Sequence, residues 1–213
     1  MKFPRMATAL VAVGLTFALG AAPAVAHTRS SEPGTRSLAA VLTADGNRFD
    51  RNPNDYDIVT EAVLAVLKAK PNSPVGVLAD GDVALTAFLP TDQAFRSLVH
   101  DLTGRWYLRE SKVFDALVAA VGVDTVEAVL RYHVVPGVTL TRKAALKSDG
   151  AVLDTALPGA TITVDVKHRW LRKVVLVDAD PNDRNPVVRK FDINRGNLQI
   201  AHGITAVLRP ADL

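Results

Sequence analysis

The sequence contains no cysteine among its 213 residues. Disulfide bonds, catalysis by a thiol and attachment of a lipid to an N-terminal cysteine are therefore excluded. Exported domains with small cores often depend on disulfides. A chain without them must be stabilised by its hydrophobic core alone, and this chain is long enough to bury one.

Recognisable catalytic motifs are also absent. There is no G-x-S-x-G nucleophile elbow and no H-E-x-x-H zinc motif. The histidines are scattered, and no spacing among them forces a catalytic triad; they are His27, His100, His133, His168 and His202. We therefore expect a protein that is not an enzyme and that needs neither a cofactor nor a metal ion.

The first 26 residues have the organisation of a secretory signal peptide. A short basic start is followed by an uncharged apolar run from Met6 to Ala22 and by the small-x-small site Ala24-Val25-Ala26. We predict cleavage after Ala26, a flexible spacer over residues 27–36 and a single domain over residues 37–213. No later apolar run is long enough to cross a bilayer, so we expect a secreted protein without membrane insertion. The alanine- and valine-rich export segment indicates a bacterial source.

The charge of the chain is small and nearly balanced. The formal net charge of +3 falls to +1 when Lys2 and Arg5 leave with the signal peptide. A nearly neutral chain gives no support to a general role in binding nucleic acid or membrane surfaces.

The order of elements predicts an α+β fold, because helical periodicity dominates the first half and strand patterns the second. We expect helices over residues 37–42, 58–69, 92–99 and 112–120 and from 125 into a buried strand at 134–135. Further strands are expected over residues 85–90, 151–155, 161–166, 174–177, 186–193 and 198–210. Expected N-caps are Asp55 or Asp57, Thr91, Ser111, and Asp124 with Glu127 at capping-box spacing.

Two motifs resemble the signatures of the fasciclin-like (FAS1) family. Phe88-Leu89-Pro90-Thr91-Asp92-Gln93-Ala94-Phe95 matches the first signature, F-x-P-[TS]-[DN]-x-A-F. Leu130-Arg131-Tyr132-His133-Val134-Val135-Pro136-Gly137 is similar to the second, and the ending Ile204 to Pro210 is similar to the family's I-x-x-[VI]-L-x-P. The resemblance covers residues 38–210. One departure is Ala201-His202-Gly203, where the family usually has Asn-Gly.

This resemblance implies a monomeric domain in which helices pack on a β-wedge or sandwich of about seven strands. It also implies a non-catalytic role in cell adhesion, with an extracellular protein or a cell-surface glycan as partner. The residues that match the family's adhesion segment are Leu130, Tyr132, His133 and Val134. A competing interpretation is that Tyr132 and His133 serve the core at a helix-to-strand junction, which the buried character of Val134-Val135 favours.

A second hypothesis for function concerns the basic run over residues 167–173, which lies between two predicted strands. Trp170 could stack on a sugar ring while Arg169, Arg172 and Lys173 pair with its acidic groups. The alternative function is therefore a carbohydrate-binding or carbohydrate-processing protein. A solvated hairpin turn explains the same residues.

Two loops rich in Asp and Asn, over residues 45–57 and 178–185, could supply oxygen ligands to calcium. The first loop does not match the EF-hand pattern D-x-[DN]-x-[DN]-G, and in the second Asp183 stands where that pattern needs glycine. Asx turns and helix capping explain both loops without a ligand, and we favour that interpretation.

Overall fold

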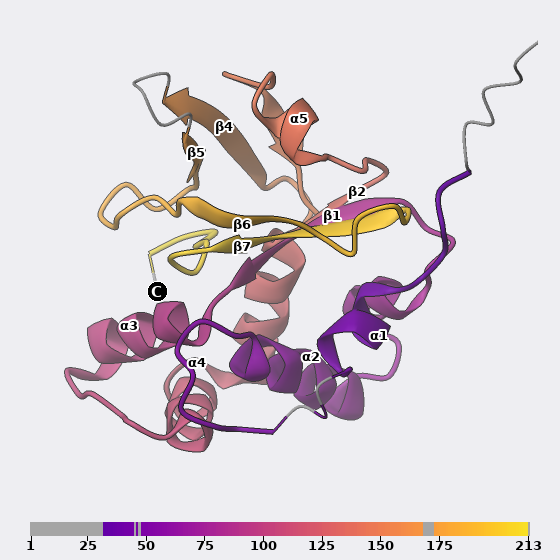
Figure 1. Ribbon diagram of the computed structural model, residues 1–213. Coiled ribbons are helices and arrows are strands. Elements are labelled where there is room, and N and C mark those ends of the chain that lie inside the picture. The colour runs from indigo at the N-terminus through magenta and orange to yellow at the C-terminus, as the bar shows by residue number, and fades with distance from the viewer. Residues whose placement is uncertain (1–31, 45, 47, 168–172, 213) are drawn as a thin grey trace, which may run out of the picture. The chain divides into compact units, whose positions relative to one another are not determined.

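The computed structural model describes residues 32–44, 46, 48–167 and 173–212 (Figure 1). The predicted signal peptide and the first half of the predicted spacer, residues 27–31, lie outside these residues, so that division of the chain stays a prediction. The chain from Pro33 to Leu213 forms one compact unit. Within the described residues, no helix is both long and apolar enough to cross a membrane.

Helices dominate the first half of the chain, as expected. The elements before the first signature are α1 (Leu38–Leu42), α2 (Asp57–Ala69) and the 3-10 helix η1 (Pro74–Ala79). Those between and after the signatures are α3 (Asp92–Thr103), α4 (Glu110–Tyr132) and the short α5 (Arg142–Ala145). α4 contains Gly122 at φ 78° and ψ 163°, which breaks the helix where the sequence predicts a helix end.

Seven strands in the described residues form two sheets. The four-stranded sheet has the order β2 (Val134–Pro136), β1 (Leu85–Pro90), β7 (Gln199–Ile204), β6 (Val188–Ile193). The three-stranded sheet has the order β3 (Val152–Asp154), β4 (Thr161–Lys167), β5 (Lys173–Val177). β1 pairs in parallel with β7 and antiparallel with β2, so the first and last thirds of the domain meet in one sheet.

The four-stranded sheet lies between the helices and the other sheet, so both its faces are covered (Figure 1). Ala87 and Leu89 of β1 belong to the core cluster shared with α2, α3 and α4, whereas Phe88 belongs to the cluster shared with β4 and β5. Val134 and Val135 of β2 divide between the two clusters in the same way. This alternation is the period of a strand, and it confirms the predicted α+β sandwich.

The predicted helix caps are partly wrong. Thr91 caps α3 as expected, its hydroxyl accepting from the N–H of Ala94. α2, however, has no side-chain cap at its N-cap residue, and the N–H of Ile58 donates instead to Asp92 of α3 at 3.0 Å. α4 begins at Glu110 rather than after Ser111, because Glu110 is buried in contacts with distant residues. Such tertiary contacts override local capping patterns.

Glu127 also departs from its expected role in a capping box. Its carboxylate accepts hydrogen bonds from Lys70 Nζ at 2.6 Å and from Ser73 Oγ at 2.5 Å. These contacts hold the C-terminal end of α2 and the start of η1 against α4. They lower the pKa of Glu127, first through Lys70 and then through Ser73.

Candidate functional site

The second signature forms the junction between α4 and β2. Tyr132, the last residue of α4, has no exposed surface. Its hydroxyl donates to the carbonyl oxygen of Thr161 at 2.8 Å and accepts from the N–H of Ala179 at 3.1 Å. The Tyr132 side chain thereby fastens the helix to β4 and to the loop after β5. Burial raises the pKa of Tyr132 to about 12, so the hydroxyl stays protonated.

His133 is the C-cap of α4, and both its ring nitrogens are hydrogen-bonded. Nδ1 lies 2.7 Å from the carbonyl oxygen of Val129, and Nε2 lies 2.9 Å from the backbone nitrogen of Leu208. Because the N–H of Leu208 can only donate, Nε2 accepts and Nδ1 carries the proton. Burial lowers the pKa of His133 to about 4, so the imidazole is neutral at pH 7.

The four residues predicted to contact a partner are all buried. Leu130, Tyr132, His133 and Val134 each expose 6 % or less of their surface. Together they fill the interior between α4, the sheets and the C-terminal segment. A partner contact through these side chains stays a prediction, and their burial disfavours it because the fold would have to open first.

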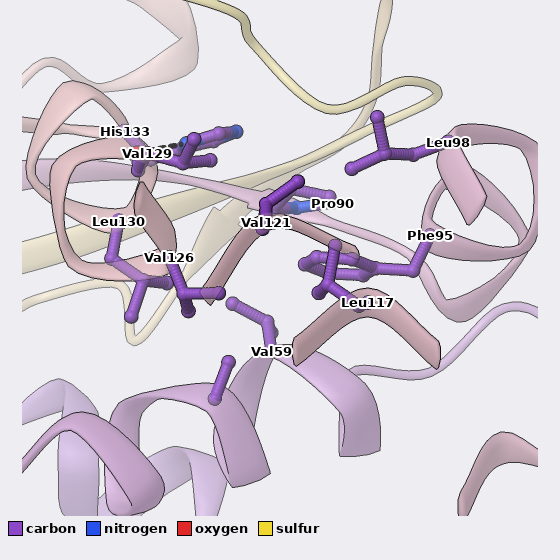
Figure 2. Close-up of a pocket in the computed structure, with 11 residues that line it drawn as sticks. Val59, Pro90, Phe95, Leu98, Leu117, Val121, Val126, Val129, Leu130 and His133 are labelled. Atoms are coloured by element: carbon purple, nitrogen blue, oxygen red, sulfur yellow. Dashed lines mark hydrogen bonds between the residues drawn. The ribbon is translucent and has the colours of Figure 1, made fainter. Parts of the chain in front are cut away.

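A small cavity lies beside this junction, between α2, the end of β1, α3 and α4 (Figure 2). Its volume is about 20 Å³, which is room for no more than one or two water molecules. The side chains around it are almost all apolar: Val59, Ala62, Pro90, Phe95, Leu98, Leu117, Val121, Val126, Val129, Leu130 and His133. A drug-sized ligand needs a far larger pocket with convergent polar groups, so we interpret this cavity as a packing defect.

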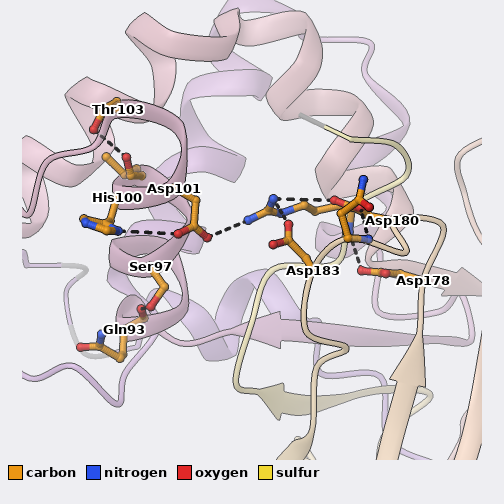
Figure 3. Close-up of polar contacts among 11 residues, drawn as sticks. Gln93, Ser97, His100, Asp101, Thr103, Asp178, Asp180 and Asp183 are labelled. Atoms are coloured by element: carbon orange, nitrogen blue, oxygen red, sulfur yellow. Dashed lines mark hydrogen bonds and ion pairs between the residues drawn. The ribbon is translucent and has the colours of Figure 1, made fainter.

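Figure 3 shows Asp178, Asp180 and Asp183 of the acidic loop after β5 gathered opposite Asp101 of α3. The largely buried Arg209 joins them. Arg209 Nη2 lies 3.1 Å from Asp101 Oδ2, and its other terminal nitrogen forms ion pairs with Asp180 and Asp183. The backbone N–H of Arg209 donates to Asp178 Oδ2 at 2.9 Å. The loop that could have held calcium therefore receives its counter-ion from the chain itself.

The predicted glycan-binding run lies mostly outside the described residues. Arg169, Trp170 and Arg172 are among the residues that the structure does not describe. Lys173 begins β5, is exposed, and pairs in the ladder with Lys167 of β4. Lys167 forms an ion pair with Asp165, which offsets part of this positive charge.

Three carboxylates that the sequence analysis did not associate form a cluster, here called the acidic pocket: Asp55, Asp92 and Glu110. Each offers one oxygen, and these oxygens lie within 4.8 Å of one another. Asp92, from the first signature, has no exposed surface, and its Oδ1 accepts from the N–H of Ile58. The acidic pocket thus joins the loop before α2 to the first residues of α3 and α4.

Glu110 has partners for both oxygens. Oε1 lies 2.8 Å from Arg96 Nη2, and Oε2 accepts from the N–H of Asp50 at 2.6 Å. Burial raises the pKa of Glu110, although the Asp50 N–H and the Arg96 charge oppose that shift. Arg96 is the cation paired with the pocket in the described structure.

Asp55 and Asp92 differ from Glu110, because one oxygen of each has no hydrogen-bond donor among the described residues. These atoms are Asp55 Oδ1 and Asp92 Oδ2. Burial first, and then hydrogen bonding and repulsion by the neighbouring Asp55 carboxyl, together raise the pKa of Asp92 to about 8. Two facing carboxylate oxygens repel unless a proton or a cation lies between them.

Two exposed large apolar side chains lie on the connection between α3 and α4. Leu108 is 85 % exposed and Trp106 is 60 % exposed, with Trp106 stacked on His100 at a ring distance of 4.2 Å. The exposed residues Arg51 and Arg109 line one hollow with Leu108. This group was not predicted from the sequence, although an aromatic residue between arginines in a loop is a pattern that can mark a binding interface. We call Arg51, Trp106, Leu108 and Arg109 the connection surface.

Comparison with known proteins agrees with the architecture. The Fasciclin domain family model matches residues 60–210, which is most of the chain. The chain therefore belongs to the Fasciclin domain family. Comparison with curated proteins gives no match.

Among solved structures, the chain is similar to a FAS1 domain pair from the insect cell adhesion molecule Fasciclin I. The TM-score is 0.52 at 17 % identity, and the match covers 74 % of this chain and 48 % of that one. The chain therefore spans about half the length of that structure, and at this identity the likeness shows the fold alone. Fasciclin domains are associated with cell-adhesion proteins and are generally not enzymes.

Proposed function

We propose that this chain is an exported, non-catalytic adhesion domain that binds an acidic extracellular partner through the connection surface. The observation that supports this proposal is the exposure of Leu108 beside Arg51 and Arg109, with the exposed Trp106 two residues earlier in the same connection. Aromatic residues and arginines are the types enriched at the energetic centres of interfaces. A guanidinium binds carboxylate or sulfate groups through paired hydrogen bonds.

The buried junction supports a different role for the second signature. Tyr132 and His133 have hydrogen-bond partners for their polar atoms within the chain, so nothing remains to offer a partner. We therefore assign the junction to folding and the connection surface to binding.

The test is adhesion of the mature chain to immobilised acidic glycans, neutral glycans and matrix proteins. The variant Trp106→Ala/Leu108→Ser/Arg109→Ser should lose binding to acidic glycans at an unchanged melting temperature. The matched control is Leu64→Ser, which changes an exposed leucine on α2. Binding that persists in the triple variant, or that occurs only to a protein without acidic character, would overturn the assignment.

A second candidate function is glycan binding by the run over residues 167–173. It is supported by the pairing of Lys167 with Lys173, which concentrates positive charge at the base of that hairpin. The variant Arg169→Ala/Trp170→Ala/Arg172→Ala separates the two candidates. Loss of glycan binding in this variant, with the connection-surface variant still active, favours the second candidate.

A further inference from the structure

When its three carboxyl groups are ionised, the acidic pocket carries more negative charge than the described residues around it neutralise. Asp55, Asp92 and Glu110 bring three carboxyl groups together, and the Glu110 carboxylate already binds Arg96. Asp92 is wholly buried, and its Oδ2 has no donor among the described residues. Leaving a buried charge without a partner costs more free energy than almost any other single feature of a fold.

The unsatisfied oxygens are shielded from solvent and belong to carboxyl groups that approach within 4.8 Å of one another. Asp55 Oδ1 and Asp92 Oδ2 are both buried atoms, and Asp92 Oδ1 is occupied by the N–H of Ile58. An amide or hydroxyl donor from the described residues does not reach them. The gap between them therefore suits a proton or a positive ion.

We propose that the acidic pocket is a calcium site, with Asp55, Asp92 and Glu110 as its protein ligands. Calcium takes six to eight oxygen ligands and tolerates irregular geometry, so water and backbone carbonyls can complete its shell. Magnesium demands a near-ideal octahedron and keeps most of its water, so it suits three converging carboxylates less well.

Bound calcium would tie three segments together. The loop that contains Asp55 already contacts α3 through the hydrogen bond from Gln93 N–H to the Pro53 carbonyl at 2.9 Å. The same loop contacts α4 through the hydrogen bond from Asp50 N–H to Glu110. The ion would neutralise the repulsion among the carboxylates that these contacts bring close. Its affinity should fall in the range of extracellular modules, about 10⁻⁴ to 10⁻³ M.

The experiment is calorimetric titration of the chelator-treated protein with calcium chloride at about pH 8, together with melting curves at constant ionic strength. We expect one binding event and a rise in melting temperature of roughly 3 °C at a calcium concentration about tenfold above Kd. Asp92→Asn should keep the hydrogen bond to Ile58 and lose calcium binding at least tenfold. Asp115→Asn, which changes an exposed carboxylate paired with Lys112, should bind calcium as the wild type does.

Three results would overturn the proposal. One is the absence of a calcium-dependent shift in the wild type, which would mean that Asp55 and Asp92 share a proton instead. Another is an equal shift in the wild type and in Asp92→Asn. The third is an equal shift with magnesium. If Asp92→Asn fails to fold, Asp55→Asn serves instead, since Asp55 is only half-buried. The proposal is independent of the adhesion assays, because its readout is calcium binding by the isolated chain.

Discussion

Both family signatures place polar side chains in the interior of this domain, but they differ in whether every polar atom has a hydrogen-bond partner. In the second signature, Tyr132 and His133 are neutral, and their hydroxyl and ring nitrogens have backbone partners. In the first signature, Asp92 is buried next to Asp55 and keeps an oxygen without a donor. A motif whose polar atoms are satisfied inside the chain is explained by folding, whereas unsatisfied polar atoms point to a ligand or a proton.

The comparison predicts that the largest loss of stability follows truncation at the junction. Tyr132→Ala removes a fully buried aromatic ring and should lower the free energy of unfolding by about 3–5 kcal/mol. Tyr132→Phe keeps the ring and removes only the hydroxyl, so it should cost about 1–3 kcal/mol. Urea unfolding measures both values. A near-neutral Tyr132→Ala would mean that the junction is not the structural centre inferred here.

The second prediction concerns the change in stability as pH decreases, and its sign follows from the lowered pKa of His133. The unfolded chain takes up a proton near pH 6.5, but folded His133 does so only near pH 4. The contribution of His133 to stability should therefore be fully present above about pH 6.5 and be lost as pH decreases to 4, by about 3 kcal/mol in total.

Stability curves from pH 7 to pH 4 test this prediction. His133→Gln should be less stable than the wild type at pH 7 but should show a smaller loss on acidification. His202 is also buried with a lowered pKa, so part of the slope should remain. His100→Gln is the control and should keep the full slope. An unchanged slope in His133→Gln would assign the acid sensitivity to other groups.

Much of this fold was predictable, because the residues that begin and end its helices and strands act locally. Pro90 and Thr91 mark the end of β1 and the start of α3, and Gly122 breaks α4 in the left-handed region. Residues of these types act on their own neighbours, so a sequence window contains the relevant physics. The apolar pair Val134 and Val135 before Pro136-Gly137 likewise predicted a buried strand, and both residues are buried in β2.

The wrong predictions share a different cause. The cap of Ile58 comes from Asp92, which lies 34 residues away along the chain. Glu127 binds Lys70 and Ser73 instead of its own helix end. Sequence patterns cannot say which distant segment will cover a residue, so the acidic pocket did not follow from them.

The third prediction concerns Asp92 in the presence of a chelator. Folded Asp92 has a pKa of about 8, against a model-peptide value of 3.8, so the folded state holds a proton that the unfolded state has lost. The contribution of Asp92 to stability should therefore be lost as pH rises from about 4 to 8, and roughly 2 kcal/mol of this loss should fall between pH 6 and 8. The charges that face Asp92 are Asp55, Glu110 and, through Glu110, Arg96.

Asp92→Asn tests the sign of this pH dependence of stability. Its amide can accept from Ile58 and donate to Asp55, so the variant should lose this pH dependence and be more stable than the wild type at pH 8. Asp115→Asn should follow the wild-type curve. A wild type that gains stability between pH 6 and 8 would contradict the raised pKa and leave only the geometric argument for the acidic pocket.

The smallest effect on stability is expected at the connection surface, and this expectation separates binding from folding most sharply. Leu108 is 85 % exposed, so Leu108→Ser removes almost no buried area and should change the free energy of unfolding by less than about 0.5 kcal/mol. The same change should weaken adhesion to acidic glycans, measured by surface plasmon resonance, because an exposed apolar side chain between arginines can be buried only by a partner. Leu64→Ser, also exposed, should leave both quantities unchanged. The contrary outcome has two parts. Leu108→Ser and Leu64→Ser would bind the acidic glycans alike, and Tyr132→Phe would weaken binding while remaining folded. The buried junction would then contact the partner, and the division of roles between the two regions would be wrong.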